Sequence, residues 1–150
     1  MDTTEIAIRL GVAALAGAAL GLNRDLHGKP TGVRTLALVG VAAALIVIAV
    51  GNGEGDVSRV MQGIVTGIGF LGAGVIVHNS FGKQVHGLTT AACVWLTACI
   101  GAVCGVGEWI VILASVPLIA AILIFGGPFE KWVHRHWPGR QPEPDEPDSD

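Results

Sequence analysis

The side chains best suited to chemistry lie in one short polar segment, residues 21–35, between two apolar stretches. Within it, Asn23 and Asp25 offer oxygen ligands, whereas Arg24 and Arg34 could bind phosphate or lipid headgroups. A single carboxylate is a weak magnesium site, because Mg²⁺ keeps several waters and usually takes one or two carboxylates. The neighbouring basic residues disfavour a cation further, so we assign no metal site here.

The histidines and cysteines do not form a recognisable site. His134 and His136 are two residues apart, which points their rings to different faces of a helix, and no acidic or thiol partner is close. The spacing of Cys93, Cys99 and Cys104 matches neither a disulfide framework nor a Cys-x-x-Cys pair. Because no nucleophile lies beside a base at workable spacing, we predict a protein that is not an enzyme and needs no cofactor.

A glycine-rich stretch, residues 61–77, contains the three-glycine dinucleotide-binding pattern between Gly67 and Gly72. That pattern has meaning only where a strand ends and a helix begins, whereas here it lies inside an apolar segment. We therefore interpret the glycines as flat positions where another helix approaches closely, within the chain or in a homodimer, and expect this stretch to form the central, most enclosed helix. The predicted packing positions are Gly17, Gly21, Gly63, Gly67, Gly69, Gly72, Gly74, Gly101 and Gly105.

Spanning helices must position these groups, because the composition is that of a membrane protein. Of the 150 residues, 51% are hydrophobic and only 14% are charged, whereas soluble domains have about 25% charged residues. Five apolar segments approach the length that a spanning helix needs; they are residues 6–22, 36–51, 61–77, 88–106 and 109–125. The sequence therefore predicts an all-α membrane domain over residues 1–127, a bundle of about five transmembrane helices.

The basic residues predict the orientation, since Lys and Arg are retained on the cytoplasmic side. They gather in the first loop, in the third loop and after the fifth segment, whereas the second loop is acidic. We therefore expect the N-terminus outside and the C-terminus in the cytoplasm. This orientation predicts a cytoplasmic polar cluster, formed by Asn23, Arg24, Asp25, Arg34, Thr35, His86, Thr89 and Thr90.

Polar residues also lie within the predicted spans, namely Glu5, Arg9, Gln62, Thr66 and Thr97. Glu5 precedes Arg9 by four residues, which favours an ion pair within one helix. Gln62 and Thr66 share one face of the third segment. Such groups either line a substrate or ion path or make hydrogen bonds between helices, and we favour hydrogen bonding for the uncharged ones.

The C-terminal part differs from the spans. Residues 126–128, Gly-Gly-Pro, should end the fifth helix. Residues 128–137 combine tryptophan with lysine and arginine, as an interfacial juxtamembrane segment does. Residues 138–150 are rich in proline and acidic side chains, so we expect a disordered acidic tail, and it accounts for the net charge of −3.

Three blocks carry a family resemblance: Gly21-Leu-Asn-Arg-Asp25 with Gly28-Lys-Pro-Thr-Gly-Val-Arg-Thr35, Gly67-Ile-Gly-Phe-Leu-Gly-Ala-Gly-Val-Ile76, and Val85-His-Gly-Leu-Thr-Thr-Ala-Ala-Cys-Val-Trp95. With the span pattern, they resemble the MgtC/SapB family of bacterial inner-membrane proteins. The resemblance implies a five-helix membrane domain with its N-terminus outside, in a short form without the cytoplasmic C-terminal domain of longer members. The family usually has an acidic residue in place of Asn23, which further weakens a cation site.

The resemblance also implies a role in magnesium or stress homeostasis. Family members are associated with adaptation to low magnesium and, in pathogens, with virulence, and some regulate membrane machines such as the ATP synthase. We hypothesise a non-enzymatic factor in the lipid bilayer that acts through a membrane-protein partner or as a homodimer, with no nucleic-acid partner. The alternative is a small ion or magnesium transporter or channel, with a path between the third and fourth segments that Gln62, Thr66, Thr89, Thr90 and Thr97 would line.

Overall fold

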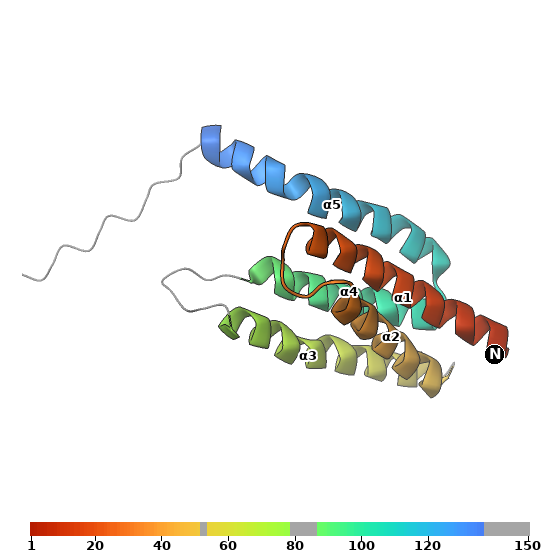
Figure 1. Cartoon of the computed structure of the whole chain (residues 1–150). Coiled ribbons are helices and arrows are strands. Elements are labelled where there is room, and N and C mark those ends of the chain that lie inside the picture. The colour runs from red at the N-terminus through yellow and green to blue at the C-terminus, as the bar shows by residue number, and fades with distance from the viewer. Residues whose placement is uncertain (52–53, 79–86, 137–150) are drawn as a thin grey trace, which may run out of the picture.

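The protein folds as one bundle of helices. The structure is a computed structural model that describes residues 1–51, 54–78 and 87–136. Its helices run side by side (Figure 1) and are α1 (Thr3–Leu26), α2 (Val33–Val50), α3 (Glu54–His78), α4 (Leu88–Val106) and α5 (Trp109–His136). All five are long and apolar enough to cross a membrane, and no strand occurs in these ranges. The predicted all-α membrane fold with five spanning helices is therefore confirmed.

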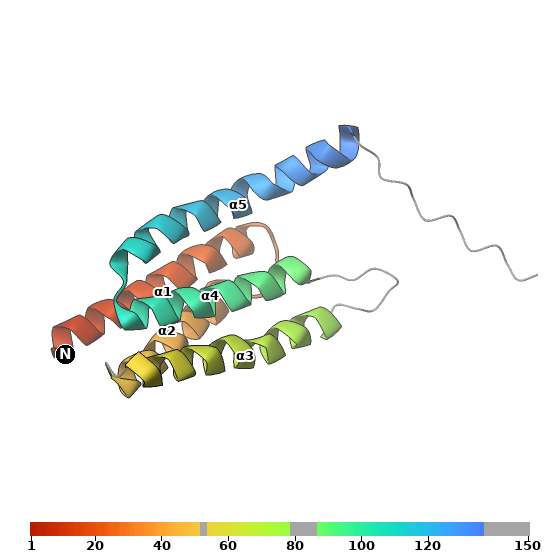
Figure 2. The ribbon, with the colours of Figure 1, turned by 180° about the vertical axis from the view of Figure 1, so that it is seen from behind.

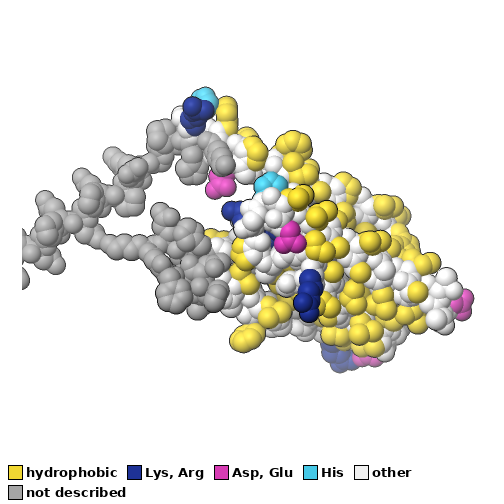
Figure 3. All heavy atoms as spheres, in the orientation of Figure 1, with side chains coloured by type: hydrophobic (Ala, Val, Ile, Leu, Met, Phe, Trp, Pro, Cys, Tyr) yellow, Lys and Arg dark blue, Asp and Glu magenta, His cyan; other side chains and the backbone are white. Residues whose placement is uncertain are grey.

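The outer surface of the bundle suits lipid. Hydrophobic side chains cover much of the face seen in Figure 3, and Phe70 and Ile110 are 83% and 81% exposed. Soluble monomers rarely expose apolar patches of this extent. We call the end of the bundle that holds Met1 the amino end, and the end that holds the connection between α1 and α2 the loop end.

Glycines set both limits of α4. α4 follows Gly87 and stops before Gly107, and both glycines adopt positive φ values, 95° and 90°. At its C-terminus, the N–H groups of Gly107 and Glu108 both donate to the carbonyl of Val103. A glycine in the left-handed conformation ends a helix in this way, because it satisfies carbonyls that the helix leaves without partners.

The most enclosed helix is α4, which contacts all four of the others (Figure 2). In its spanning segment 56% of the residues are buried, against 28% in α1 and in α2 and 6% in α3. The prediction that residues 61–77 form the central helix is therefore wrong. Lipid is as apolar as a protein core, so apolar composition does not tell a buried helix from a peripheral one.

α1 and α2 approach closely at two glycines that the sequence marked as packing positions. A Cβ atom added to Gly17 would lie 2.5 Å from the carbonyl oxygen of Leu36. One added to Gly21 would lie 2.5 Å from the Cα of Val33. Real Cβ atoms do not approach backbone this closely, so only glycine fits at these two positions.

α2 and α4 also meet backbone to backbone. A Cβ atom on Gly101 would overlap the carbonyl group of Gly40, and one on Gly105 would lie 2.8 Å from the carbonyl oxygen of Ala44. A Cβ atom added to Gly40 would lie only 2.8 Å from the carbonyl oxygen of Ala13 in α1. The sequence did not predict Gly40 as a packing position. The three helices α1, α2 and α4 therefore form the tightly packed core of the bundle.

The glycines of α3 behave differently. A Cβ added to Gly63, Gly67, Gly69 or Gly74 would meet nothing within 4 Å, and at Gly72 it would make an ordinary contact of 3.6 Å with the Cβ of Ala91. The prediction that these glycines pack against another helix of the chain is therefore wrong for Gly63, Gly67, Gly69 and Gly74, whereas the buried Gly72 does contact α4. Packing against a second copy or a partner stays a prediction.

α5 packs through one stripe in its first half, formed by Ile112, Val116, Ile119 and Leu123. The helix continues through Pro128 to His136, so the prediction that residues 126–128 end it is wrong. Glycine and proline are tolerated within helices at membrane depth, because the surroundings compensate the lost hydrogen bond. The interfacial position of residues 128–137 stays a prediction, and the tail predicted for residues 138–150 lies outside the described residues.

Candidate functional site

One buried arginine organises the loop end. Arg24, in the last turn of α1, is only 4% exposed. Its Nε and Nη2 atoms donate to the carbonyl oxygen of Pro30, at 3.1 and 2.8 Å, and Nη2 also donates to the hydroxyl of Thr90, at 2.5 Å. Its Nη1 atom lies 3.5 Å from the sulfur of Cys93. This single side chain therefore joins α1, the loop after it and the first turns of α4.

The partners of Arg24 are neutral. No carboxylate pairs with it among the described residues, and its cost of burial is offset by charge-assisted hydrogen bonds, which are stronger than neutral ones. Its donors already point to protein acceptors, which leaves little capacity for a phosphate or headgroup. We infer that Arg24 is a structural clamp, in contrast to the anion-binding role that its charge alone suggests.

Asp25, the neighbouring residue, caps α2. Its Oδ2 atom accepts a hydrogen bond of 2.9 Å from the backbone N–H of Val33, the first residue of that helix. A Cβ atom on Gly32 would overlap the Asp25 carboxylate, so this close approach requires glycine. A carboxylate at a helix N-terminus satisfies an orphan N–H and interacts favourably with the helix dipole. The arrangement explains Asp25 without a metal ion.

Removing this cap should destabilise the protein. We expect Asp25→Ala to lower the free energy of unfolding by about 0.5–2 kcal/mol, the usual effect of losing an N-terminal cap. Asp25→Asn should lose less, because its side-chain oxygen still accepts the bond from Val33. Melting temperatures in detergent would measure both effects. If Asp25→Ala melts like the parent protein, the cap does not contribute to stability.

The predicted cytoplasmic polar cluster is only partly assembled. The structure brings together Arg24 and Thr90, with Cys93 and the turn at Pro30, which sequence reasoning had not assigned to it. No hydrogen bond joins the other described members to Arg24 or Thr90: Arg34, Thr35 and Thr89 are exposed, Asn23 is half-buried, and Asp25 bonds to Val33. His86 lies outside the described residues. The spacing of three between Thr90 and Cys93, which places them on one helical face, was the available signal.

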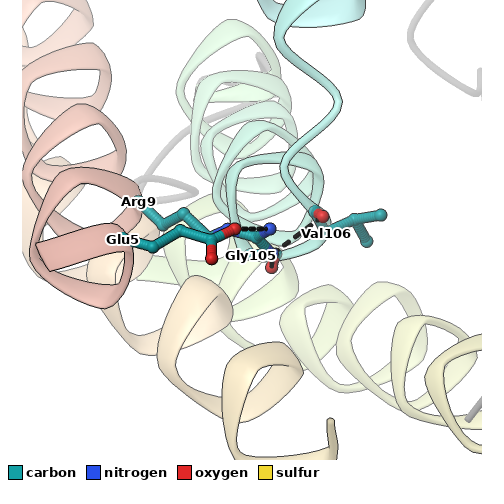
Figure 4. Close-up of polar contacts among 4 residues, drawn as sticks. All are labelled: Glu5, Arg9, Gly105 and Val106. Atoms are coloured by element: carbon teal, nitrogen blue, oxygen red, sulfur yellow. Dashed lines mark hydrogen bonds and ion pairs between the residues drawn. The ribbon is translucent and has the colours of Figure 1, made fainter. Parts of the chain in front are cut away.

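A second arginine connects two helices at the amino end. Nη1 of Arg9 donates to the carbonyl oxygens of Gly105 and Val106, at 2.6 and 2.8 Å, and Nη2 forms an ion pair with Glu5 (Figure 4). The ion pair agrees with the spacing of four residues. The contact with α4 was missed, because sequence alone does not show which helix end lies nearby. A cation is favourable there, since carbonyls at a helix C-terminus carry partial negative charge.

Gly107 is the residue that lets Arg9 reach α4. It adopts a φ of 90°, and a Cβ atom there would lie 2.6 Å from Nη2 of Arg9. We expect Gly107→Ala to lower the melting temperature, because it adds about 1 kcal/mol of backbone strain and displaces Arg9. Gly126→Ala is the control, because this glycine is helical with open space around it. Equal stability of the two variants would contradict the role of Gly107.

The polar residues within the spans do not face one path. Thr97 is fully buried and donates to the carbonyl of Cys93, at 2.7 Å, and its methyl group lies beside Gly40 of α2. Thr90 bonds to Arg24, whereas Gln62 and Thr66 are exposed. Thr90 and Thr97 are therefore occupied by contacts within the bundle, whereas a path lined by Gln62 and Thr66 stays a prediction.

Two hollows flank α3. The first, with a volume of about 700 Å³, lies at the amino end between the ends of α2 and α4 and the start of α3, and Arg9 is part of its wall. The second, of about 510 Å³, is a groove between α2 and α3. Gly63 and Gly67 border this groove, opposite Ala42 and Ile46.

In the described ranges, no group of three His, Cys, Asp or Glu side chains could hold a metal ion.

The model of the MgtC family matches residues 10–132, which is most of the chain. The chain belongs to the MgtC family. It is 43% identical to protein SrpB of Synechococcus elongatus, with 72% of this chain and 67% of the relative covered. It is 40% identical to the putative magnesium transporter YhiD of Escherichia coli, with 82% and 61% covered. It is 41% identical to protein MgtC of Salmonella typhimurium, with 75% and 48% covered.

This MgtC-family chain thus spans about half to two thirds of the length of these relatives. No solved structure matches it. The region that matches the family includes Arg24, Asp25, Thr90 and most of the five helices. The loop-end clamp is therefore part of the segment that carries the family identity.

Proposed function

We propose that this protein is a non-enzymatic, multi-pass protein of the bacterial inner membrane that serves magnesium or stress homeostasis by binding another membrane protein. Its membership of the MgtC family supports a membrane role. The polar groups at the loop end support a non-catalytic one, because Arg24 and Asp25 are occupied by contacts that hold helices together. The proposal keeps the predicted orientation, with the loop end in the cytoplasm.

The main support for this proposal is the groove between α2 and α3, which offers a binding site for another helix. Its walls are aliphatic or small side chains, and Gly63 and Gly67 give it a flat edge without a Cβ. Spanning helices associate where small residues let their backbones approach. In the described part of the chain, no helix occupies the groove. A single helix of a partner, or α3 of a second copy, would fill it with apolar contacts.

Two leucine variants on α3 test the groove. Gly67→Leu places a large side chain at the groove, whereas Gly69→Leu, on the same helix, lies outside its lining and has equally open space. Both should accumulate normally, because neither glycine packs within the chain. Gly67→Leu alone should fail to restore growth of a deletion strain in low magnesium.

Photocrosslinking identifies the occupant. A photoreactive amino acid at Ile64, which lines the groove, should capture one partner in native membranes, and Gly67→Leu should remove the product. The family resemblance makes a subunit of the ATP synthase the first candidate, and a second copy the next. If Gly67→Leu and Gly69→Leu complement equally and the crosslink persists in both, the groove is not the binding site.

Transport is the second candidate function, because the relative from Escherichia coli is named a putative magnesium transporter. The purified protein in liposomes should show no saturable magnesium flux if it acts through a partner. A flux that is lost in Arg34→Ala, whose side chain is exposed and makes no hydrogen bond or ion pair in the described residues, would replace the partner-binding proposal.

A further inference from the structure

The cavity at the amino end joins a charged wall to an apolar interior. Its volume of about 700 Å³ lies within the range of roughly 300–1,000 Å³ that is typical of small-molecule sites. Val47, Val65 and Val103 line it from three helices, and Arg9 and Glu108 also border it. Such a hollow suits a molecule with a polar head and a hydrocarbon chain.

The geometry of Arg9 points to a missing acceptor. The side chain is 12% exposed, and its Nη atoms bond to Glu5 and to two carbonyls of α4. Its Nε–H group has no acceptor but is buried out of reach of a ligand, whereas Nη2 bonds only to Glu5 among the described residues and keeps a second N–H. An oxygen atom from a ligand can accept from this second N–H of Nη2. Arginine binds phosphate through adjacent N–H groups.

The charges around the cavity specify the headgroup. Arg9 is balanced by its ion pair with Glu5, and the exposed carboxylate of Glu108 adds a negative charge at the cavity wall. A ligand with a net negative charge would be repelled by Glu108. A headgroup that carries both a phosphate and an ammonium matches Arg9 and Glu108 together.

The dimensions of the cavity favour one lipid chain. Val65 is eleven residues into α3, so the lining extends about 16 Å from the start of that helix, at 1.5 Å per residue. The charged residues of the lining, Arg9 and Glu108, lie towards the amino end, where lipid headgroups meet the hydrocarbon region, and Gln62 is a neutral polar residue further along α3. An acyl chain that follows the valines would therefore leave its headgroup at the level of Arg9.

We propose that this cavity binds one zwitterionic phospholipid of the phosphatidylethanolamine class. Its phosphate accepts from Arg9, its ammonium donates to Glu108, and one acyl chain lies between α2, α3 and α4. The site lies at the opposite end of the bundle from the Arg24 clamp and does not include the glycines of the groove. It therefore stands independently of the proposed partner.

Lipid retention tests the site. The full chain would be delipidated in detergent and incubated with phosphatidylethanolamine or phosphatidylglycerol, and bound lipid would be counted by native mass spectrometry. The parent protein should retain one phosphatidylethanolamine per chain in preference to phosphatidylglycerol. Val65→Trp should lower retention strongly by obstructing the path of the acyl chain, whereas Leu118→Trp, a matched change on the exposed face of α5, should retain the lipid fully.

Two further variants test the headgroup contacts. Glu108→Gln should lower the preference for phosphatidylethanolamine roughly two- to five-fold, as expected for a partly exposed ion pair. Arg9→Lys, which keeps the charge without the planar donor group, should weaken retention of both lipids. Equal retention in Val65→Trp and Leu118→Trp, or an unchanged preference in Glu108→Gln, would overturn the proposal and indicate ordinary bilayer lipid. Because Glu108 is exposed, that variant stays informative if Arg9→Lys fails to fold.

Discussion

Gly101→Leu should prevent folded protein from accumulating. A Cβ atom at this position already overlaps the carbonyl group of Gly40, and leucine adds three more carbon atoms between α2 and α4. Overpacking a core costs about 1–3 kcal/mol when neighbours can shift. Here the obstacle is the backbone of α2, which faces the most buried helix, so the two helices must separate and lose their contact along the whole interface.

Gly11→Leu is the matched control, because Gly11 lies in α1 and a Cβ there would meet nothing within 4 Å. Fluorescence-detected size-exclusion chromatography of tagged variants would measure the amount of monodisperse protein. We expect Gly101→Leu to lose nearly all of that peak and Gly11→Leu to keep it. A normal peak for Gly101→Leu would mean that α2 and α4 do not cross at Gly40.

The contrast between these glycines shows what the sequence determines about the fold. The number of helices and their type followed from apolar length, because hydrocarbon requires the backbone to satisfy its own hydrogen bonds. Both limits of α4 and the start of α5 also followed, whereas α1 and α3 begin earlier and α5 ends later than their apolar segments. Apolar length did not identify which helix lies at the centre of the bundle. Gly101 in α4 and Gly67 in α3 occur in similar apolar surroundings, yet only Gly101 has a neighbouring helix against it. Neighbours depend on the pairing of helices, which apolar composition does not encode.

The candidate sites show the same division. The ion pair of Glu5 with Arg9 is local, so the spacing of four residues was sufficient to predict it. The contact of Arg24 with Thr90 joins residues 66 positions apart, and it forms only because α1 and α4 pack together. Asp25 was a candidate ligand by residue type, but the turn after α1 returns the chain so that its carboxylate meets the start of α2. Residue type predicted where polar groups gather, and packing decided their roles.

Arg24→Met should produce the largest loss of stability among changes to the polar residues. It would leave the buried hydroxyl of Thr90 and the carbonyl of the exposed Pro30 without their donor. Hydrogen bonds to charged groups contribute about 1.5–3 kcal/mol each, and water can replace the donor only at Pro30, so the free energy of unfolding should fall by about 2–4 kcal/mol. Arg24→Lys should recover only part of this, because an ammonium cannot span both acceptors as a planar guanidinium does.

Arg34→Ala provides the control, since Arg34 is exposed and makes no hydrogen bond or ion pair in the described residues. Unfolding in a denaturing detergent would rank the variants, with Arg24→Met least stable, Arg24→Lys intermediate and Arg34→Ala close to the parent. A double-mutant cycle with Thr90→Val should give a coupling energy of about 0.5–3 kcal/mol between Arg24 and Thr90. A coupling near zero would mean that the two side chains do not interact, and the contact between α1 and α4 at the loop end would then rest on helix packing alone.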